Sequence, residues 1–259
     1  MRGLLARGIH VRFGTRHVLE GLDLPPLAPG EVTVLAGPNA AGKSTLLRAI
    51  AQLQPHRGEV TLDGENLARM AAQARARLVG FMPQTLPAGS SLVALESVIA
   101  ALRAGGAMPA AQADATAMAV MEKLGIAALA LEPLSAMSGG QRQMVSLAQA
   151  IVRDPRLLLL DEPTSALDMA RQVRLLSELR RLAGEGRIVV AVLHDLALAA
   201  QWADRIVLLH DGRTHAVGTP EEVLTPALLA EVYGVTARVE RCSRGRIMVL
   251  IDGEHAPAC

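Results

Sequence analysis

The chain has 259 residues, enough for one large domain or two small ones with a sizeable hydrophobic core. Hydrophobic residues make up 51% of it, yet no stretch reaches the roughly 18 uncharged apolar residues of a membrane-spanning helix. The N-terminal apolar run contains charges and has no small-residue cleavage site, so we expect no signal peptide. A net charge of +1, an aromatic content of 2% and the lack of a basic run argue against a nucleic-acid-binding surface.

Apolar runs alternate with helical patterns along the chain, which predicts an α/β fold with a largely parallel sheet. The first part of the chain contains a predicted helix after its third predicted strand. The strands are expected at 7–13, 17–24, 31–36, 58–64 and 77–84, and the helix at 43–53. Between about 85 and 155 the pattern changes to helices without strands, which indicates a helical insertion. These helices are expected at 90–104, 110–125 and 139–154.

The α/β pattern returns after this insertion. It predicts strands at 156–163 and 187–194, helices at 168–183 and 196–203, a strand-forming stretch at 205–218, and a final strand at 246–251 after a short helical stretch. We expect a single domain, 1–259, with an α/β core at about 1–84 and 156–218, a helical subdomain at about 85–155 and a C-terminal extension at 219–259. Cys242 and Cys259 lack the spacing of metal ligands, and we interpret them as incidental thiols in a reducing cytoplasm.

The stretch GPNAAGKST, residues 37–45, fits the phosphate-binding pattern G-x-x-x-x-G-K-[ST] between a buried strand and a helix. Backbone N–H groups and the helix N-terminus favour phosphate here, Lys43 supplies a positive charge, and Ser44 supplies a hydroxyl for Mg²⁺. The alternative is an ordinary glycine-rich turn from strand to helix. The predicted nucleotide-binding residues are Gly37, Pro38, Asn39, Ala40, Ala41, Gly42, Lys43, Ser44 and Thr45.

A run of four leucines ends in Asp161 and Glu162. Adjacent carboxylates at the end of a buried strand are costly unless a cation or a reacting water uses them. Asp161 therefore fits a magnesium shell, and Glu162 fits a base that polarises water for attack on the γ-phosphate; solvated acids at an exposed strand end are the alternative. Gln84 and His194 each follow a predicted strand and could reach the same sheet edge, although each could instead be an ordinary surface or structural residue.

A second glycine-rich turn, MSGGQRQM at 137–144, also begins a predicted helix. Such a turn presents backbone N–H groups of the kind that hold phosphate. One nucleotide needs only one such cradle, so a single chain gives no reason for the second.

In this order the motifs resemble those of the nucleotide-binding subunit of an ATP-binding cassette (ABC) transporter, over nearly the whole chain. Phe13 corresponds to the adenine-stacking residue, 37–45 to the Walker A loop, Gln84 to the Q-loop, MSGGQ to the signature, Asp161 and Glu162 to Walker B, SALD to the D-loop and His194 to the switch histidine. Phe13 could instead be a core aromatic. The resemblance implies a P-loop NTPase cassette with a RecA-like core, an antiparallel β subdomain and a helical subdomain.

The same resemblance implies an ATPase that uses ATP and Mg²⁺ and works as a homodimer of cassettes. Gln84 would contact Mg²⁺ and link to the membrane subunit, and His194 would hydrogen-bond the γ-phosphate. The signature residues Ser138, Gly139, Gly140 and Gln141 would act on ATP bound to the second cassette, and the D-loop residues Ser165, Ala166, Leu167 and Asp168 would lie at the dimer interface. For Asp168 a helix N-cap role is an additional expectation.

Three residues depart from the usual family pattern. Ala40 stands where glycine is usual, so its Cβ would penalise a left-handed backbone, although the N–H that faces phosphate is kept. Met137 replaces leucine in the signature, which conserves side-chain volume. Phe13 replaces the commoner tyrosine, and stacking needs only the ring. We therefore expect nucleotide binding to persist.

A single cassette without a membrane span is similar to bacterial importers whose permeases are separate chains. The stretches HDLALAAQWADRIVLLHDGR and GTPEEVLTPALLAEVYGV resemble the iron-siderophore, haem and cobalamin subgroup, and ERCSRGR favours ferric siderophore as the cargo. The implied partners are two integral membrane permeases and, indirectly, a periplasmic or lipoprotein solute-binding protein, with the chain on the cytoplasmic face of the plasma membrane. Residues 85–104 would form the groove for a permease helix or pack on their own subdomain. A soluble ABC ATPase acting on ribosomes or DNA, and a P-loop kinase or GTPase-like switch, are the remaining alternatives.

Overall fold

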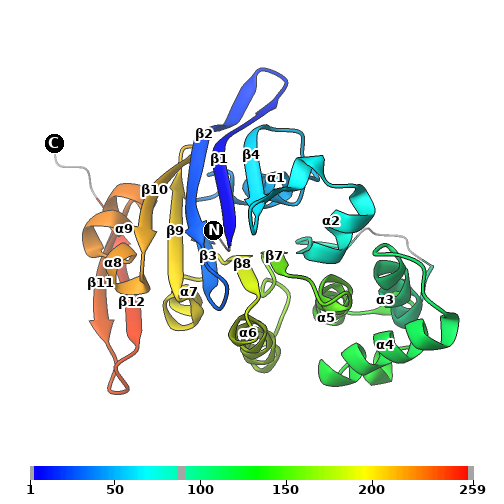
Figure 1. Cartoon of the computed structure of the whole chain (residues 1–259). Helices are drawn as coiled ribbons and strands as arrows, with labels where there is room; N and C mark the ends of the chain where they lie inside the picture. The colour runs from blue at the N-terminus through cyan, green and yellow to red at the C-terminus, as the bar shows by residue number, and fades with distance from the viewer. Residues whose placement is uncertain (1–2, 87–90, 256–259) are drawn as a thin grey trace.

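A computed structural model describes residues 3–86 and 91–255 of the chain, arranged in three sheets with helices around them (Figure 1). Part of the expected groove, 87–90, and Cys259 lie outside the described residues. Among the residues that are described, every helix is too short or too polar to span a lipid bilayer.

The core sheet has six strands in the order β10-β9-β3-β8-β7-β6. All neighbouring pairs are parallel except β9 with β10. The strands are β3 (Val32–Ala36), β6 (Val79–Met82), β7 (Leu157–Asp161), β8 (Ile188–Val192), β9 (Arg205–His210) and β10 (Arg213–Gly218). Because β3, β6, β7 and β8 run parallel, their carboxyl ends meet at one edge, which is where nucleotide ligands bind in open α/β sheets.

The leucine run of β7 shows how both faces of this sheet are covered. Leu157 and Leu159 belong to one core cluster, whereas Leu158 and Leu160 belong to the other, and all four are fully buried. Successive side chains of a strand point to opposite faces, so a continuous apolar run is expected for a strand between two helical layers. One layer contains α1 (Lys43–Ile50), and the other contains α6 (Met169–Gly184) and α7 (Leu196–Trp202).

A second, antiparallel sheet packs against α1 and has the order β2-β1-β4-β5. Its strands are β1 (Leu4–Phe13), β2 (Arg16–Leu27), β4 (Arg57–Leu62) and β5 (Glu65–Asn66), followed by a 3₁₀ turn at Leu67–Arg69. The strand expected at 17–24 is longer than predicted, because β2 lies at the edge of the sheet and continues through Pro25 and Pro26. Proline is tolerated there because an edge strand leaves some of its N–H positions without a ladder partner.

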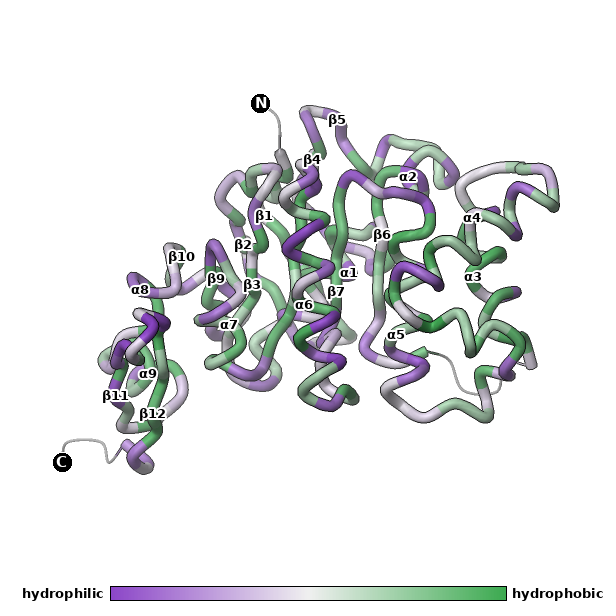
Figure 2. The backbone as a smooth tube through the Cα atoms, turned by 90° about the horizontal axis from the view of Figure 1, so that it is seen from below, coloured by the Kyte–Doolittle hydropathy of each residue, from purple (hydrophilic) through white to green (hydrophobic). Residues whose placement is uncertain are grey.

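The helices that follow β6 pack beside the edge of the core sheet (Figures 1 and 2). They are α3 (Ala94–Arg103), α4 (Ala110–Lys123) and α5 (Gly139–Ile151), with 3₁₀ turns at Ala127–Leu129 and Leu134–Ala136. A further helix before β6, α2 (Ala72–Leu78), was not expected. Because α2 ends at Leu78, the strand predicted at 77–84 is shorter in the structure and is limited to β6. No residue of α2 is buried. A helix without a buried face needs no apolar periodicity, so the sequence carries no signal that predicts it.

The C-terminal part forms two short helices and a hairpin at the opposite end of the molecule from the helical subdomain (Figure 2). The elements are α8 (Pro220–Val223), α9 (Pro226–Tyr233), β11 (Val235–Arg241) and β12 (Ile247–Glu254). The strand expected at 246–251 is therefore the second strand of a hairpin whose first strand was not predicted.

Candidate nucleotide site

The loop between β3 and α1 begins and ends with residues whose conformations suit glycine. Gly37 has φ 141°, and a Cβ there would lie 2.2 Å from the main-chain oxygen of Leu209. Gly42 has φ 97° and is the N-cap of α1 without a side-chain cap, so the first N–H groups of this helix have no capping side chain. Unsatisfied N–H groups at a helix N-terminus favour an anion.

Ala40 in this loop has φ 65°, the left-handed conformation expected from its place in the pattern. For a residue with a Cβ this conformation costs roughly 1–2 kcal/mol. The loop therefore adopts a left-handed turn at residue 40 despite the Cβ of alanine, at some cost in stability.

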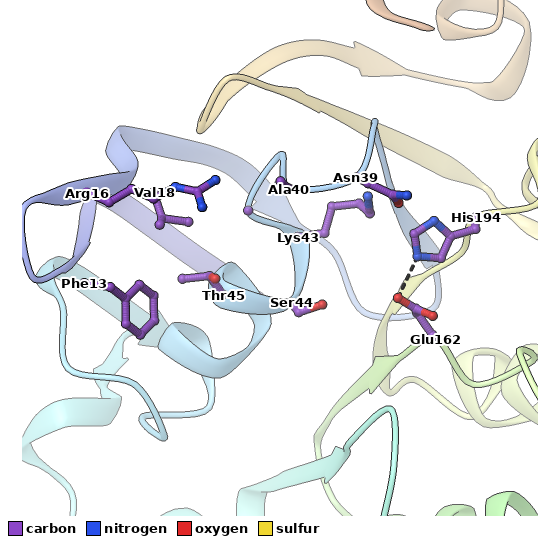
Figure 3. Close-up of a pocket in the computed structure, with 11 residues that line it drawn as sticks. Phe13, Arg16, Val18, Asn39, Ala40, Lys43, Ser44, Thr45, Glu162 and His194 are labelled. Atoms are coloured by element: carbon purple, nitrogen blue, oxygen red, sulfur yellow. Dashed lines mark hydrogen bonds and ion pairs between the residues drawn. The ribbon is translucent and has the colours of Figure 1, made fainter. Parts of the chain in front are cut away.

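This loop lines a cavity of about 390 Å³ that extends from β1 and β2 to the ends of β7 and β8. In Figure 3, Phe13 and Arg16 lie at one end, Glu162 and His194 at the other, and Lys43 and Ser44 between them. Phe13 is 51% exposed and lines this cavity, so it is not a core residue. An exposed ring at the mouth of a cavity has a free face on which a nucleobase could stack.

Lys43 is almost buried, and its ammonium donates hydrogen bonds to the main-chain oxygens of Gly37 (2.7 Å) and Pro38 (2.8 Å). Burial lowers the pKa of Lys43, against the opposing effect of the nearby carboxylates Glu162 and Asp161. The ammonium is held within the loop by two carbonyl oxygens that a phosphate group could replace as its partners.

Asp161 is the last residue of β7 and its side chain is fully buried. Its Oδ1 accepts a hydrogen bond from the Ser44 hydroxyl (2.7 Å), whereas its Oδ2 has no hydrogen-bond partner and lies 3.8 Å from an Arg48 nitrogen. Burial raises the pKa of the Asp161 carboxyl, partly offset by Ser44 and Arg48. A buried carboxylate oxygen without a partner is costly, and a bound cation would satisfy it.

Glu162 follows directly, has the left-handed φ of 50°, and lines the cavity. Its Oε1 lies 2.6 Å from Nε2 of His194, and its Oε2 accepts a hydrogen bond from the Gln84 amide (2.8 Å). The structure therefore brings together Gln84, Glu162 and His194 from the ends of three different strands, as their positions in the sequence predict. Both oxygens of the carboxylate have a partner in this state.

The signature turn lies elsewhere. Ser138 is the N-cap of α5: its Oγ accepts from the Gln141 N–H (3.3 Å), and Oε1 of Gln141 accepts from the Ser138 N–H (2.8 Å). This reciprocal capping box fixes the start of the helix. None of the signature residues Ser138, Gly139, Gly140 and Gln141 is among those that line the cavity around the Walker A loop.

The D-loop connects β7 to α6. Asp168 is the N-cap of α6, with its Oδ1 accepting from the Arg171 N–H at 2.9 Å, so the expected capping role is present. Leu167 is buried, whereas Ser165 and Ala166 are exposed. The exposed part of this loop is free to face another molecule.

Four residues at this site were not predicted from the sequence. Arg16 and Val18 of β2 line the cavity beside Phe13. Tyr233 of α9 lies beside the main chain of Gly37, and burial raises the pKa of Tyr233 to about 12. Gln143 of α5 donates to the main-chain oxygen of Glu162 at 3.0 Å. Only Gln143 has a recognisable signal, a polar residue on the apolar face of an amphipathic helix.

Comparison with known proteins identifies the family of this site. The family model described as ABC transporter matches residues 23–165. A protein named hemin import ATP-binding protein HmuV, from Rhodococcus jostii (strain RHA1), is 41% identical over 250 residues, covering 95% of this chain and 85% of that protein. This chain belongs to the ABC transporter family. A protein of the same name from Pseudomonas putida is 41% identical over 247 residues, covering 92% of this chain and 94% of that protein.

Solved structures agree with this membership. The dimeric structure of MJ0796, a bacterial ABC transporter cassette, has a TM-score of 0.77 and 28% identity to this chain, covering 84% of it and 98% of that cassette. The expected architecture of a parallel core, an antiparallel β subdomain and helices is confirmed. The chain is an ATP-binding subunit of an ABC transporter, and its enzymatic activity is ATP hydrolysis coupled to transport.

Proposed function

We propose that this ABC subunit hydrolyses ATP to energise the import of haem. The observation that carries the cargo is the name of the relatives: two proteins 41% identical to this chain, over more than nine-tenths of its length, are named hemin import ATP-binding proteins. This supports the haem alternative better than the ferric siderophore favoured by the sequence. Cargo does not touch an ATP-binding subunit, so the tail sequence ERCSRGR carries less weight than similarity along the whole chain.

The proposed ATP site is supported by residues that line one cavity. Phe13 stacks on the adenine, and the loop of residues 37–45 wraps the phosphates. Lys43 exchanges the carbonyl oxygens of Gly37 and Pro38 for phosphate oxygens when ATP enters. The uncapped start of α1 adds further N–H donors for the phosphate groups.

The residues around Asp161 fit a magnesium ion. Mg²⁺ prefers hard oxygen ligands and keeps several waters, and the buried Asp161 Oδ2 lacks a hydrogen-bond partner beside the Ser44 hydroxyl. Ser44, Asp161 and Gln84 would hold the ion together with phosphate oxygens. When bound, Mg²⁺ supplies positive charge that neutralises the phosphates. Within 3–86 and 91–255 no cluster of three His, Cys, Asp or Glu side chains forms an all-protein metal site, which agrees with an ion that depends on ATP.

Glu162 is the proposed general base. Each carboxylate oxygen keeps a second lone pair, so Glu162 can take a proton from the attacking water while Gln84 and His194 orient it. When ATP is bound, His194 leaves Glu162 to hydrogen-bond the γ-phosphate. Gln84, directly after β6, leads into the segment that we propose as the permease groove, so its contact couples hydrolysis to the membrane subunit.

The second glycine-rich turn is explained by a second copy of the chain. Ser138 and Gly140 lie outside the cavity of their own chain, and we propose that they cover the γ-phosphate of ATP bound to the partner cassette. A two-fold dimer would then contain two such shared sites. Further proposed partners are two permeases and, indirectly, a solute-binding protein, with the cassette dimer on the cytoplasmic face of the membrane.

Growth on defined iron sources tests the proposed cargo. A host strain that lacks this chain is supplied with haemin or with a ferric siderophore as the sole iron source, and is complemented with wild type or with Glu162→Gln. We expect the strain without this chain to grow on the ferric siderophore but not on haemin. Growth on haemin should return with the wild-type gene and should not return with Glu162→Gln. A defect confined to ferric siderophore would refute haem as the cargo, and normal growth on both would refute iron import altogether.

The purified chain tests the proposed base directly. Glu162→Gln should bind ATP as wild type does, since the carboxylate lies at the far end of the cavity from Phe13 (Figure 3), and it should lose nearly all turnover. Hydrolysis by this variant at the wild-type rate would show that another group activates the water.

A further inference from the structure

The side chain of Gln143 connects the signature helix to the main chain of Glu162. Gln143 lies in the second turn of α5, is only 5% exposed, and donates from Nε2 to the Glu162 carbonyl oxygen at 3.0 Å. A buried amide is costly without a hydrogen-bond partner. This contact joins residues that are 19 positions apart in the sequence and belong to different layers of the fold.

The Glu162 carbonyl is an unusual acceptor because three donors converge on it. Two belong to Ser165, whose hydroxyl lies at 3.1 Å and whose N–H lies at 3.3 Å. These two are local contacts of the turn after β7. Gln143 is the donor that reaches this oxygen from another element, so its amide ties the Glu162 carbonyl to α5.

The conformation of Glu162 explains what this tie would do. A φ of 50° is strained for a residue with a Cβ, at roughly 1–2 kcal/mol, and such strain persists only where surrounding contacts hold it. The orientation of the Glu162 peptide sets the direction of its side chain. Hydrogen bonds to the carbonyl therefore fix the main chain from which the carboxylate reaches His194 and Gln84.

We infer that Gln143 is a positioning residue that holds the Glu162 main chain and thereby couples the placement of the signature helix to the base. The inference rests on the proposed function, because it assigns a role to a neighbour of the proposed base. Ser138 and Gly140, at the start of α5, are proposed to cover the partner's ATP, and Gln143 lies about one turn further along the same helix. One helix thus contacts both nucleotide sites of a dimer, and its displacement at one site moves the carbonyl at the other.

The first test replaces the amide by an apolar side chain of similar length. Gln143→Met removes the donor, and we expect kcat for ATP hydrolysis to fall on the order of tenfold, since small misplacements of catalytic groups have large effects on rate. The dissociation constant of ATP should stay within about twofold, because Gln143 does not line the cavity.

Gln172→Met is the matched control. Gln172 of α6 also donates its amide to a main-chain oxygen of this segment, that of Thr164 at 3.3 Å, without touching Glu162. Its kcat should remain close to wild type. An equal loss in both variants would overturn the positioning role of Gln143, because it would show that any amide contact to this segment matters equally.

A double variant separates positioning from damage to the fold. If Gln143 acts through the Glu162 carboxylate, Gln143→Met should not lower the residual single-turnover rate of Glu162→Gln any further. A further tenfold loss would overturn the inference. Gln143→Asn, which keeps the amide but is one methylene too short to reach the carbonyl, takes the place of Gln143→Met if that variant does not fold.

These outcomes remain distinct from failure of the proposed function. If Glu162→Gln hydrolyses ATP at the wild-type rate, the proposed base is wrong. If Glu162→Gln is inactive while Gln143→Met has wild-type kcat, the base stands and the role of Gln143 is wrong.

Discussion

Replacing Asp161 by asparagine should stabilise the nucleotide-free chain even though it disables the site. The Asp161 side chain is fully buried, its Oδ1 is hydrogen-bonded to Ser44, and its Oδ2 has no hydrogen-bond partner. Burial of this kind raises the carboxyl pKa, which means that the folded chain holds the charged form at a cost. Asparagine keeps the oxygen that accepts from Ser44 and removes the buried charge.

The expected gain in the free energy of unfolding is the difference between the costs of burying a neutral polar group and burying a charged one. An unpartnered buried neutral polar group costs about 1–3 kcal/mol, and an unpaired buried charge costs several. The nearest cation, Arg48, is too distant at 3.8 Å to donate a good hydrogen bond, so it offsets only part of the penalty. We expect Asp161→Asn to raise the free energy of unfolding by about 1–2 kcal/mol, which is roughly 2–8 °C in Tm for a chain of this size.

Thermal unfolding at neutral pH in a chelating buffer without nucleotide measures this change. Asp195→Asn is the control, because Asp195 is an exposed N-cap of α7 and asparagine caps a helix equally well. The control should stay within about 0.5 kcal/mol of wild type. An Asp161→Asn chain that is equally or less stable than wild type would show that this carboxylate is satisfied in the apo protein, and the argument for a cation site would fail. Addition of Mg²⁺ and ATP should stabilise wild type and not the variant.

Three further predictions concern single side chains. Burial disfavours the Glu178 carboxylate, but hydrogen bonds from Arg181 outweigh burial and lower the carboxyl pKa. Glu178→Gln should therefore lower the free energy of unfolding by about 1 kcal/mol at neutral pH, and this difference should vanish in acid, below the lowered pKa. In Gly37→Ala the new Cβ would lie 2.2 Å from a β9 carbonyl oxygen, so ATP affinity should fall at least tenfold in a binding assay, whereas Gly184→Ala, with open space around it, should bind normally. Phe13→Ala should weaken ATP binding by about 1–3 kcal/mol and leave kcat at saturation unchanged, measured by titration with a fluorescent ATP analogue.

The candidate site could be predicted from sequence where its residues are contiguous or end a recognisable strand. The loop of residues 37–45 has a fixed spacing, and Asp161 with Glu162 follows a short leucine run that is typical of a buried strand. Parallel strands bring their carboxyl ends together, so Gln84 and His194 were correctly expected beside these residues. These inferences need the order of motifs and no knowledge of side-chain packing.

The remaining contacts depend on geometry that a sequence does not contain. The positioning role inferred for Gln143 depends on the left-handed conformation of Glu162 and on how deeply α5 packs, and neither can be derived from the sequence. The position of Tyr233 beside Gly37 depends on how the C-terminal extension packs against the end of the core. Among the elements, α2 was missed because its exposed residues show no apolar period, and β11 was missed because charged residues alternate along an exposed hairpin.

The order of the strands in the core sheet has a consequence for how the chain folds as it is synthesised. In the sheet β3 lies between β8 and β9, and Leu35 pairs in register with Val192. The strand that begins the phosphate loop therefore emerges from the ribosome long before either neighbour exists, and the whole helical subdomain is made in between. Pairings of such long sequence separation form slowly. Until β8 and β9 arrive, the apolar β3 is an unpaired strand open to aggregation, so a chaperone that shields it during translation should increase the yield of folded protein.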